Sequence, residues 1–309
     1  MLHLRLIVPP DRTDVVLGHL VATPGVVHVV RGAGSTTQPA GDIVLCDVAR
    51  EAANDVVEWL QDHGVHRDGA IVIEAVEVVV SDAAAAAEIA SPGAGGDALV
   101  WEEVEARARD DATMTASFLV FMSVAALIAA IGILLDSPIL VIGAMVVGPD
   151  YGPLAALCVA IVRRRADDGL VATRTVGVGL GVAALAAFLG TLLFRLTSVA
   201  PDAYDLGERQ LTAFISRPDA LGAVVAVLAG VVGMLSLTEA RSGALIGVLV
   251  SVTTIPAVGN VGAAAAYGAW REVGGAALQL AINVTGLVVA GAVTLAVQAR
   301  LTTRRLPIG

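Results

Sequence analysis

The stretch GAMVVGPDYGP, residues 143–153, decides how this chain is interpreted. It places two prolines, three glycines and one carboxylate inside a long apolar run. A regular helix cannot contain such residues without bending, and hydrocarbon tolerates unpaired backbone groups only where protein or a water-filled cavity covers them. The stretch therefore predicts a broken transmembrane helix at a polar site inside a membrane.

The composition predicts an integral membrane protein. Hydrophobic residues make up 56% of the chain and charged residues 16%, with a mean hydropathy of +0.80, which is too apolar for an ordinary soluble domain. The net charge of −10 is unevenly distributed along the chain. Residues 1–111 contain nineteen acidic residues and seven arginines, whereas residues 112–309 contain ten acidic residues and twelve arginines. The two parts are therefore expected in different solvents. Cys46 and Cys158 are expected to pack in the interior without forming a disulfide.

Residues 1–80 are predicted to form a ferredoxin-like domain in the cytoplasm. Its first strand has apolar residues at every second position, namely Leu2, Leu4, Leu6 and Val8. Further strands are expected at residues 26–30, 43–48 and 71–80, and helices at residues 11–21 and 51–62. The order βαββαβ is that of the split βαβ fold, which frequently serves as a ligand sensor or dimerisation module.

Residues 31–37 of this domain, RGAGSTT, are the part that suggests chemistry. Their amides and hydroxyls could wrap an anion or a nucleoside as a regulatory ligand, through Gly32, Gly34, Ser35 and Thr36. A flexible hairpin connection explains the same residues, and we favour that interpretation. The histidines lack metal-ligand spacing, so no metal site is predicted.

Two segments are expected to lead into the membrane. Residues 81–98 are rich in alanine, glycine and proline, which is typical of a linker. Residues 99–111 resume a helical pattern with apolar and charged residues on opposite sides, which predicts an amphipathic helix at the membrane surface. Trp101 is expected at the level of the lipid headgroups.

Residues 112–299 are predicted to form an all-α transmembrane domain, followed by a cytoplasmic tail at residues 300–309. Six apolar segments are long enough to cross about 30 Å of hydrocarbon: residues 112–135, 138–162, 176–194, 220–237, 243–269 and 276–297. An even number of spans returns both termini to one side, and the distribution of arginines predicts that this side is the cytoplasm. The expected location is the cell membrane.

The six segments divide into two similar halves of three. Each half contains a long interrupted segment, with Gly143 ten residues before Pro153 in the first and Gly247 nine residues before Pro256 in the second. Because three is odd, the second half enters the membrane upside down relative to the first. This predicts a 3+3 inverted repeat of the kind that secondary transporters use, with the broken helices facing each other near the midplane.

The polar residues at the breaks are the predicted binding site for a small polar solute or ion. A carboxylate such as Asp150 is costly in a bilayer, so it marks function by default. The candidates are Gly148, Pro149, Asp150, Tyr151, Gly152 and Pro153 at the first break, Thr253, Thr254, Pro256 and Asn260 in the fifth span, and Asn283 in the sixth. An alternative for the threonines and asparagines is that they only form hydrogen bonds between helices. A separate alternative for Asp150 is a position at the membrane interface.

These motifs resemble a known family. The segments around Gly148, Ser216-Arg217-Pro218, Gly230, Pro256 and Asn283 are similar to the bacterial and archaeal hydrophobic proteins grouped as domain of unknown function 389, over roughly residues 99–297. In many relatives the first motif resembles Ser-Pro-Leu-Met-Gly-Pro and the second has two adjacent prolines. Here Gly148 and Asp150 replace serine and leucine, and the second motif has one proline. The resemblance implies no activity.

The sequence thus predicts a transporter or channel-like protein for a small polar solute or ion, with a cytoplasmic regulatory domain. The alternative is a membrane-anchored receptor for a nucleoside, nucleotide or amino acid that transports nothing. An enzyme is not expected, because no Ser–Lys, His–Glu or paired-carboxylate arrangement occurs within the spans. No cofactor and no nucleic acid are expected. Small residues on the spans and exposed strand edges predict a homo-oligomer in the lipid bilayer.

Overall fold

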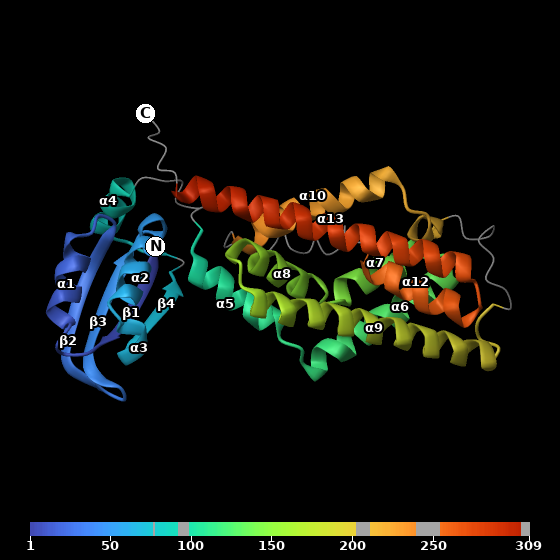
Figure 1. Cartoon of the computed structure of the whole chain (residues 1–309), viewed down its shortest axis with the longest axis horizontal. Helices are drawn as coiled ribbons and strands as arrows, with labels where there is room; N and C mark the ends of the chain where they lie inside the picture. Colours follow the sequence, from blue (N-terminus) through green and yellow to red (C-terminus); the bar gives the residue numbers. More distant parts are fainter. Residues whose placement is uncertain (77, 92–98, 202–210, 239–253, 304–309) are drawn as a thin grey trace. The chain divides into compact units, whose positions relative to one another are not determined.

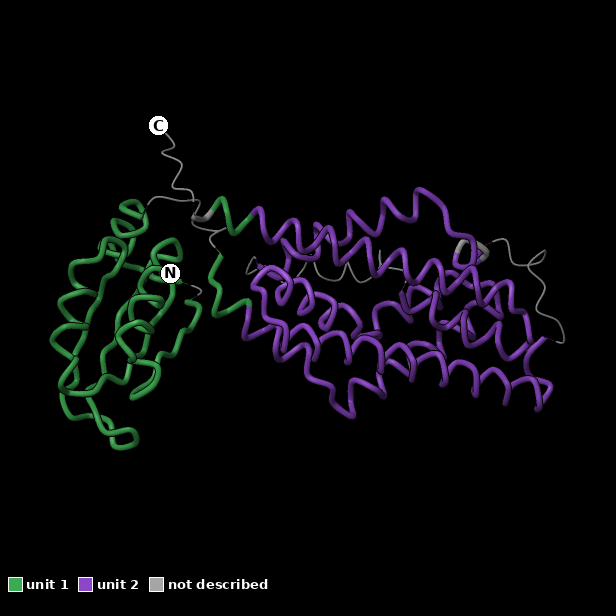
Figure 2. The backbone as a smooth tube through the Cα atoms, viewed as in Figure 1, with its two compact units in different colours: residues 1–104, 298–309 green, residues 105–297 purple. Residues whose placement is uncertain are grey.

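The computed structural model describes residues 1–309 except 77, 92–98, 202–210, 239–253 and 304–309 (Figure 1). The chain is α+β and divides into two compact units (Figure 2). The first consists of residues 1–104 and 298–309, and the second of residues 105–297. The first contains the four-stranded sheet, and the second contains only helices among its described residues.

The sheet of the first unit confirms the predicted βαββαβ order. Its elements are β1 Leu2–Val8, α1 Thr13–Ala22, β2 Val26–Thr37, β3 Ala40–Val48, α2 Arg50–Asp62, the short α3 Val65–Asp68 and β4 Ala70–Ala75. The strands are arranged β2-β3-β1-β4, and every neighbouring pair is antiparallel.

The predicted alternation in β1 produces the core of this unit. Its even-numbered residues are buried in one cluster with Val16 and Leu20 of α1 and Val56 and Leu60 of α2. Side chains two residues apart point to the same face of a strand, so both helices cover one face of the sheet.

Two strands end at other positions than predicted. β2 continues through residues 31–37 to Thr37, because β3 pairs with it beyond a bulge between Gly32 and Thr36. β4 ends at Ala75, where its partner β1 begins with Leu2. Of the expected extension to residue 80, the described residues 76 and 78–80 are not part of the strand.

Two helices lie in the segments expected to lead into the membrane. α4, Asp82–Ala90, falls within the predicted linker and is capped by Ser81, whose hydroxyl accepts a hydrogen bond from the amide of Ala84. α5, Trp101–Ala112, follows. The apolar residues of the α5 pattern, among them Val100, Val104 and Ala108, are buried within the protein. Its place at a membrane surface stays a prediction.

The second unit contains the apolar helices. They are α6 Ala116–Leu134, α7 Pro138–Val147, α8 Tyr151–Arg163, α9 Ala166–Leu196, α10 Ala220–Thr238, α12 Thr254–Ala266 and α13 Trp270–Thr303, with a short 3₁₀ turn at Ala213–Ser216. Four of these helices, α6, α9, α10 and α13, are long and apolar enough to cross a membrane. The pair α7 and α8 is bent by 54° at its break and, counted as one span, brings the number to five.

The predicted fifth span, residues 243–269, lies partly outside the described residues, and its described part is α12. The count of six spans and their 3+3 arrangement therefore stay predictions. The long helices nevertheless expose large apolar side chains on their outer surfaces, as α9 does with Leu185, Leu189 and Leu193. A continuous apolar exterior of this kind is expected for a protein surrounded by lipid.

Small residues hold the centre of the second unit together. The core around α6, α9 and α12 is rich in alanine, including Ala126, Ala129, Ala183 and Ala187. A Cβ on Gly262 of α12 would clash with the carbonyl oxygen of Ala184 on α9. Helices that approach this closely gain packing contacts that do not depend on water, which is the usual basis of helix association in membranes.

We expect Cys46, in the core of the first unit, to resist thiol reagents while the protein is folded. Burial raises the pKa of Cys46 to about 12, and thiol reagents attack the thiolate. In a Cys158→Ala variant, labelling by Ellman's reagent at about pH 8 should occur only after denaturation. Release of thionitrobenzoate from the folded protein, at the rate of a free cysteine, would contradict this burial.

Candidate functional site

The predicted break in the second span is present and falls at Gly148-Pro149-Asp150. α7 ends at Val147, and Gly148 caps it in an extended conformation. Asp150 is the N-cap residue of α8, and Pro153 is the third residue of that helix. A proline is tolerated there because the first turn of a helix has amides without intrahelical partners. The prolines therefore end one helix and start another at an angle.

A contact between two distant segments places Asp150 at the start of α12. The hydroxyl of Thr254, the first residue of α12, donates a hydrogen bond to Oδ2 of Asp150. Asp150 is 9% exposed and Thr254 is 1% exposed. The N-terminal ends of α8 and α12 thus meet at one carboxylate, where the partial positive charge of both helix ends favours a negative group.

The residues next to this contact pack equally closely. A Cβ on Gly148 would lie 2.5 Å from Cγ1 of Ile255, so only glycine fits between the two segments at that point. Pro256 is the third residue of α12, as Pro153 is of α8. The structure therefore brings together four predicted site residues, Gly148, Asp150, Pro153 and Thr254, while Pro149 and Pro256 adjoin them in sequence.

A small cavity lies beside Asp150 and Thr254. Its volume is about 10 Å³, which is close to the minimum that accommodates one water molecule. The other side chains that line it are apolar: Phe118, Met122, Pro153, Leu154, Val176, Leu180 and Val284. In this conformation the cavity has room for a water molecule or a bare cation, and not for a larger solute.

The comparison with protein families matches this part of the chain. The family described as domain of unknown function 389 (DUF389) matches residues 145–289. The chain contains a DUF389 domain. The matched region starts just before the break at Gly148 and includes α12 and Asn283. No curated protein and no solved structure matches the chain.

The other predicted site residues are spread through the DUF389 domain. Tyr151 is 8% exposed, and its hydroxyl lies against Gly233 of α10, with no hydrogen-bond partner in the described part of the chain. Gly152 lies against the side chain of Asp111. Asn260 and Asn283 are buried in α12 and α13 but do not line the cavity beside Asp150. Thr253 lies outside the described residues.

Gln279 belongs with these buried polar residues and was missed in the sequence. Its Nε2 donates to Oδ1 of Asn283 over 2.9 Å, one helical turn further along α13. Its Oε1 is buried and makes no hydrogen bond to any residue that the structure describes. The available signal was an amide side chain in an apolar run, four residues before a second amide.

The glycine-rich segment of the first unit is already engaged within the protein. The amide of Gly34 donates to Oδ1 of Asp42 over 2.7 Å, and Arg31 donates to Oδ2 of the same carboxylate. Thr36 donates its hydroxyl hydrogen to the carbonyl of Gly41. Gly32 lies in the paired part of β2 and Ser35 in its bulge. The amide of Gly34 and the side chains of Arg31 and Thr36 are thus bonded to β3. Few hydrogen-bond donors of this segment remain for a ligand.

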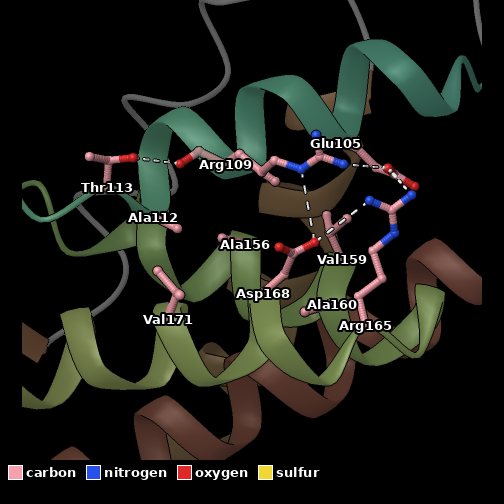
Figure 3. Close-up of a pocket in the computed structure, with 11 residues that line it drawn as sticks. Glu105, Arg109, Ala112, Thr113, Ala156, Val159, Ala160, Arg165, Asp168 and Val171 are labelled. Atoms are coloured by element: carbon pink, nitrogen blue, oxygen red, sulfur yellow. Dashed lines mark hydrogen bonds and ion pairs between the residues drawn. The ribbon is translucent and has the colours of Figure 1, made fainter. Parts of the chain in front are cut away.

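A second pocket lies between the C-terminal half of α5, the end of α8 and the start of α9 (Figure 3). Its volume is about 210 Å³. Glu105, which is 10% exposed, contacts three arginines. The distances are 3.1 Å to Arg109, 2.5 Å to Arg163 and 2.8 Å to Arg165. In the sequence, the arginines indicated only the orientation of the spans, and Glu105 belonged to the charged side of the predicted amphipathic helix.

The turn after α8 explains how two of these arginines reach one carboxylate. Arg164 caps α8 in a left-handed conformation with φ of 54°. The amide of Arg165 then donates back to the carbonyl of Ala160 over 3.0 Å. Because the chain reverses at Arg164, the side chains on either side of it both point to Glu105.

The bond between Thr254 and Asp150 should contribute measurably to the stability of the DUF389 domain. Thr254→Val keeps the shape of the side chain but leaves a buried carboxylate without this donor. We expect a loss of about 1–3 kcal/mol, seen as a lower Tm in detergent by circular dichroism. Thr254→Ser retains the hydroxyl and should stay close to the wild type. Equal Tm values for the two variants would show that the bond is unimportant.

Asp42→Asn should destabilise the first unit at neutral pH and lose this effect in acid. The hydrogen bond from Gly34, with that from Arg31, holds the pKa of Asp42 below its ordinary 3.8, although burial opposes this. A carboxyl with a lowered pKa contributes stability above its unfolded pKa, and the contribution disappears as the pH falls through the folded pKa.

The Tm difference between wild type and Asp42→Asn should therefore be largest near neutral pH and shrink below about pH 4. Thermal melts followed by circular dichroism measure it. Glu58→Gln, on the exposed side of α2, is the control and should show a small difference at every pH. A difference for Asp42→Asn that persists at low pH would contradict the role of the charged carboxylate.

Proposed function

We propose that the chain is a multi-pass membrane protein that moves a small polar solute or ion across the bilayer, and that Asp150 binds it. The observation that carries this proposal is the buried Asp150 carboxylate at the point where α8 and α12 begin. Interrupted helices that meet at a polar group inside the membrane domain are how many secondary transporters build a substrate or coupling-ion site.

We propose a cation or a proton as the ligand of Asp150, because the two helix ends beside it supply only partial positive charge. In the described part of the chain, the one side chain that donates to this carboxylate is the neutral hydroxyl of Thr254. No arginine or histidine lines the adjoining cavity among the described residues. A carboxylate in such surroundings is stabilised by protonation or by a bound cation. The volume of about 10 Å³ also favours a dehydrated ion over a larger solute.

The order of the helices supports the proposed 3+3 repeat. Each half has an apolar helix, α6 or α10, and then a helix that contains a proline, Pro153 in α8 and Pro256 in α12. A long helix follows in each half, α9 in the first and α13 in the second. An inverted repeat of these parts would place the two interrupted helices on opposite sides of Asp150.

In this proposal both termini lie in the cytoplasm and the first unit regulates transport. The arginines near the ends of the apolar helices support this orientation. Assembly into a homo-oligomer is part of the same proposal, since small residues on the spans favour close helix contacts. We do not adopt the receptor alternative, because Asp42 engages both Gly34 and Arg31 of the segment expected to bind a metabolite.

Ion flux into liposomes tests the role of Asp150. The purified chain would be reconstituted into liposomes that contain pyranine for protons, or a Na⁺- or K⁺-selective dye for the metal ions, and the matching pH, Na⁺ or K⁺ gradient would be applied in turn. We expect ion movement above that of protein-free vesicles. Asp150→Asn should reduce it by at least about tenfold, because a neutral amide gives up the charge-assisted contact to the ion.

Asp167→Asn is the matched control, because it removes a carboxylate from an exposed position in the first turn of α9. It should leave flux unchanged, and Asp150→Glu, which keeps the charge, should retain part of it. If Asp150→Asn and Asp167→Asn transport at the same rate as the wild type, Asp150 is not the ion site. If no gradient drives flux, transport of these ions is excluded.

A further inference from the structure

The pocket of about 210 Å³ between α5, α8 and α9 has two chemically different ends (Figure 3). One end carries Glu105, Arg109, Arg165 and Asp168. The rest of the wall is mainly aliphatic, formed by Ala108, Ala112, Ala156, Val159, Ala160 and Val171. A ligand that matches both ends has a charged head and an apolar chain.

The charged end holds guanidinium groups that are incompletely paired. Nε of Arg109 lies 3.9 Å from Asp168, and Nη1 of Arg165 lies 3.7 Å from the same carboxylate. Both distances are beyond hydrogen-bond range, so these donors attract Asp168 without bonding to it. An oxyanion would accept hydrogen bonds from these two donors.

The position of the pocket indicates where its ligand comes from. α7 and α8 form a bent pair that together is long and apolar enough for one membrane span, and α9 is a candidate span of its own. The pocket lies where α8 ends and α9 begins, next to the arginine-rich turn at Arg164. At such a point the headgroup region of a bilayer supplies phosphate groups attached to acyl chains, and basic pockets between spans are suited to them.

We propose that this pocket binds an anionic phospholipid. Its phosphate contacts Arg109 and Arg165, and the adjoining methylenes lie along the wall formed by Ala112, Ala156 and Val171. The turn beside the pocket contains three consecutive arginines, residues 163–165, and such a basic turn favours an anionic headgroup over a zwitterionic one. The aliphatic wall gives a lipid an advantage over free phosphate, which has no apolar surface to bury.

Lipid titration of the full chain in detergent tests this proposal. Phosphatidylglycerol, phosphatidylcholine and inorganic phosphate would be added separately, with bound molecules counted by native mass spectrometry and Tm measured in parallel. We expect phosphatidylglycerol to bind and raise Tm more than either alternative. Arg109→Gln should weaken that binding about fivefold, the effect of one arginine near a membrane surface.

Arg109 is 54% exposed. When Arg109 is replaced, Glu105 still contacts Arg163 and Arg165, so the variant is expected to fold. Arg109→Lys should restore most of the binding because the charge remains. Arg174→Gln is the matched control, since it removes an exposed arginine from the same helix as Val171 but outside the pocket. It should bind phosphatidylglycerol like the wild type.

A second variant tests the apolar end independently. Val171→Thr changes a side chain that is 52% exposed and should weaken phosphatidylglycerol binding about fourfold, the effect of losing one methyl contact. Equal binding of phosphatidylglycerol and phosphatidylcholine would overturn the proposal. So would equal losses in Arg109→Gln and Arg174→Gln, or a full Tm increase with inorganic phosphate alone, which would identify the ligand as a free anion.

Discussion

The hydrogen bond between Thr254 and Asp150 is the interaction on which the arrangement of the DUF389 domain depends. It joins residues 104 positions apart and fixes the starts of α8 and α12 at one point. A buried carboxylate needs such a donor, and the ends of two helices supply further positive potential. Gly148 allows its segment to approach Ile255 of α12 closely. Pro153 and Pro256, each the third residue of its helix, are compatible with a helix that begins at this point.

Local patterns predicted much of this structure. The alternation in β1 identified a half-buried strand because strand periodicity is a property of the backbone, and the βαββαβ order followed from it. The break at Gly148 was predictable because proline and glycine act on their own stretch of chain. The pairing of Asp150 with Thr254, and the burial of Gln279, depend on helix packing that no local pattern encodes.

The misplaced features share one cause. Residues 31–37 have the composition of a hairpin loop, yet β3 offered a partner strand and Asp42 a carboxylate, so they became part of β2. Glu105 has the sequence surroundings of an exposed helical charge, yet arginines from a turn 58 residues away enclose it. In each case a long-range partner changed the environment that the local composition predicts.

The backbone contacts of α12 constrain how the domain can change shape. Gly262 meets the carbonyl of Ala184 on α9, and Gly259 meets the carbonyl of Ala126 on α6. Contacts of this kind contain no side-chain rotamers that could rearrange, so a shift of one of these helices against the others disrupts backbone packing. The Asp150–Thr254 bond links the elbow between α7 and α8 to this three-helix core. If the proposed transport takes place, opening that link is the movement that would uncover the carboxylate.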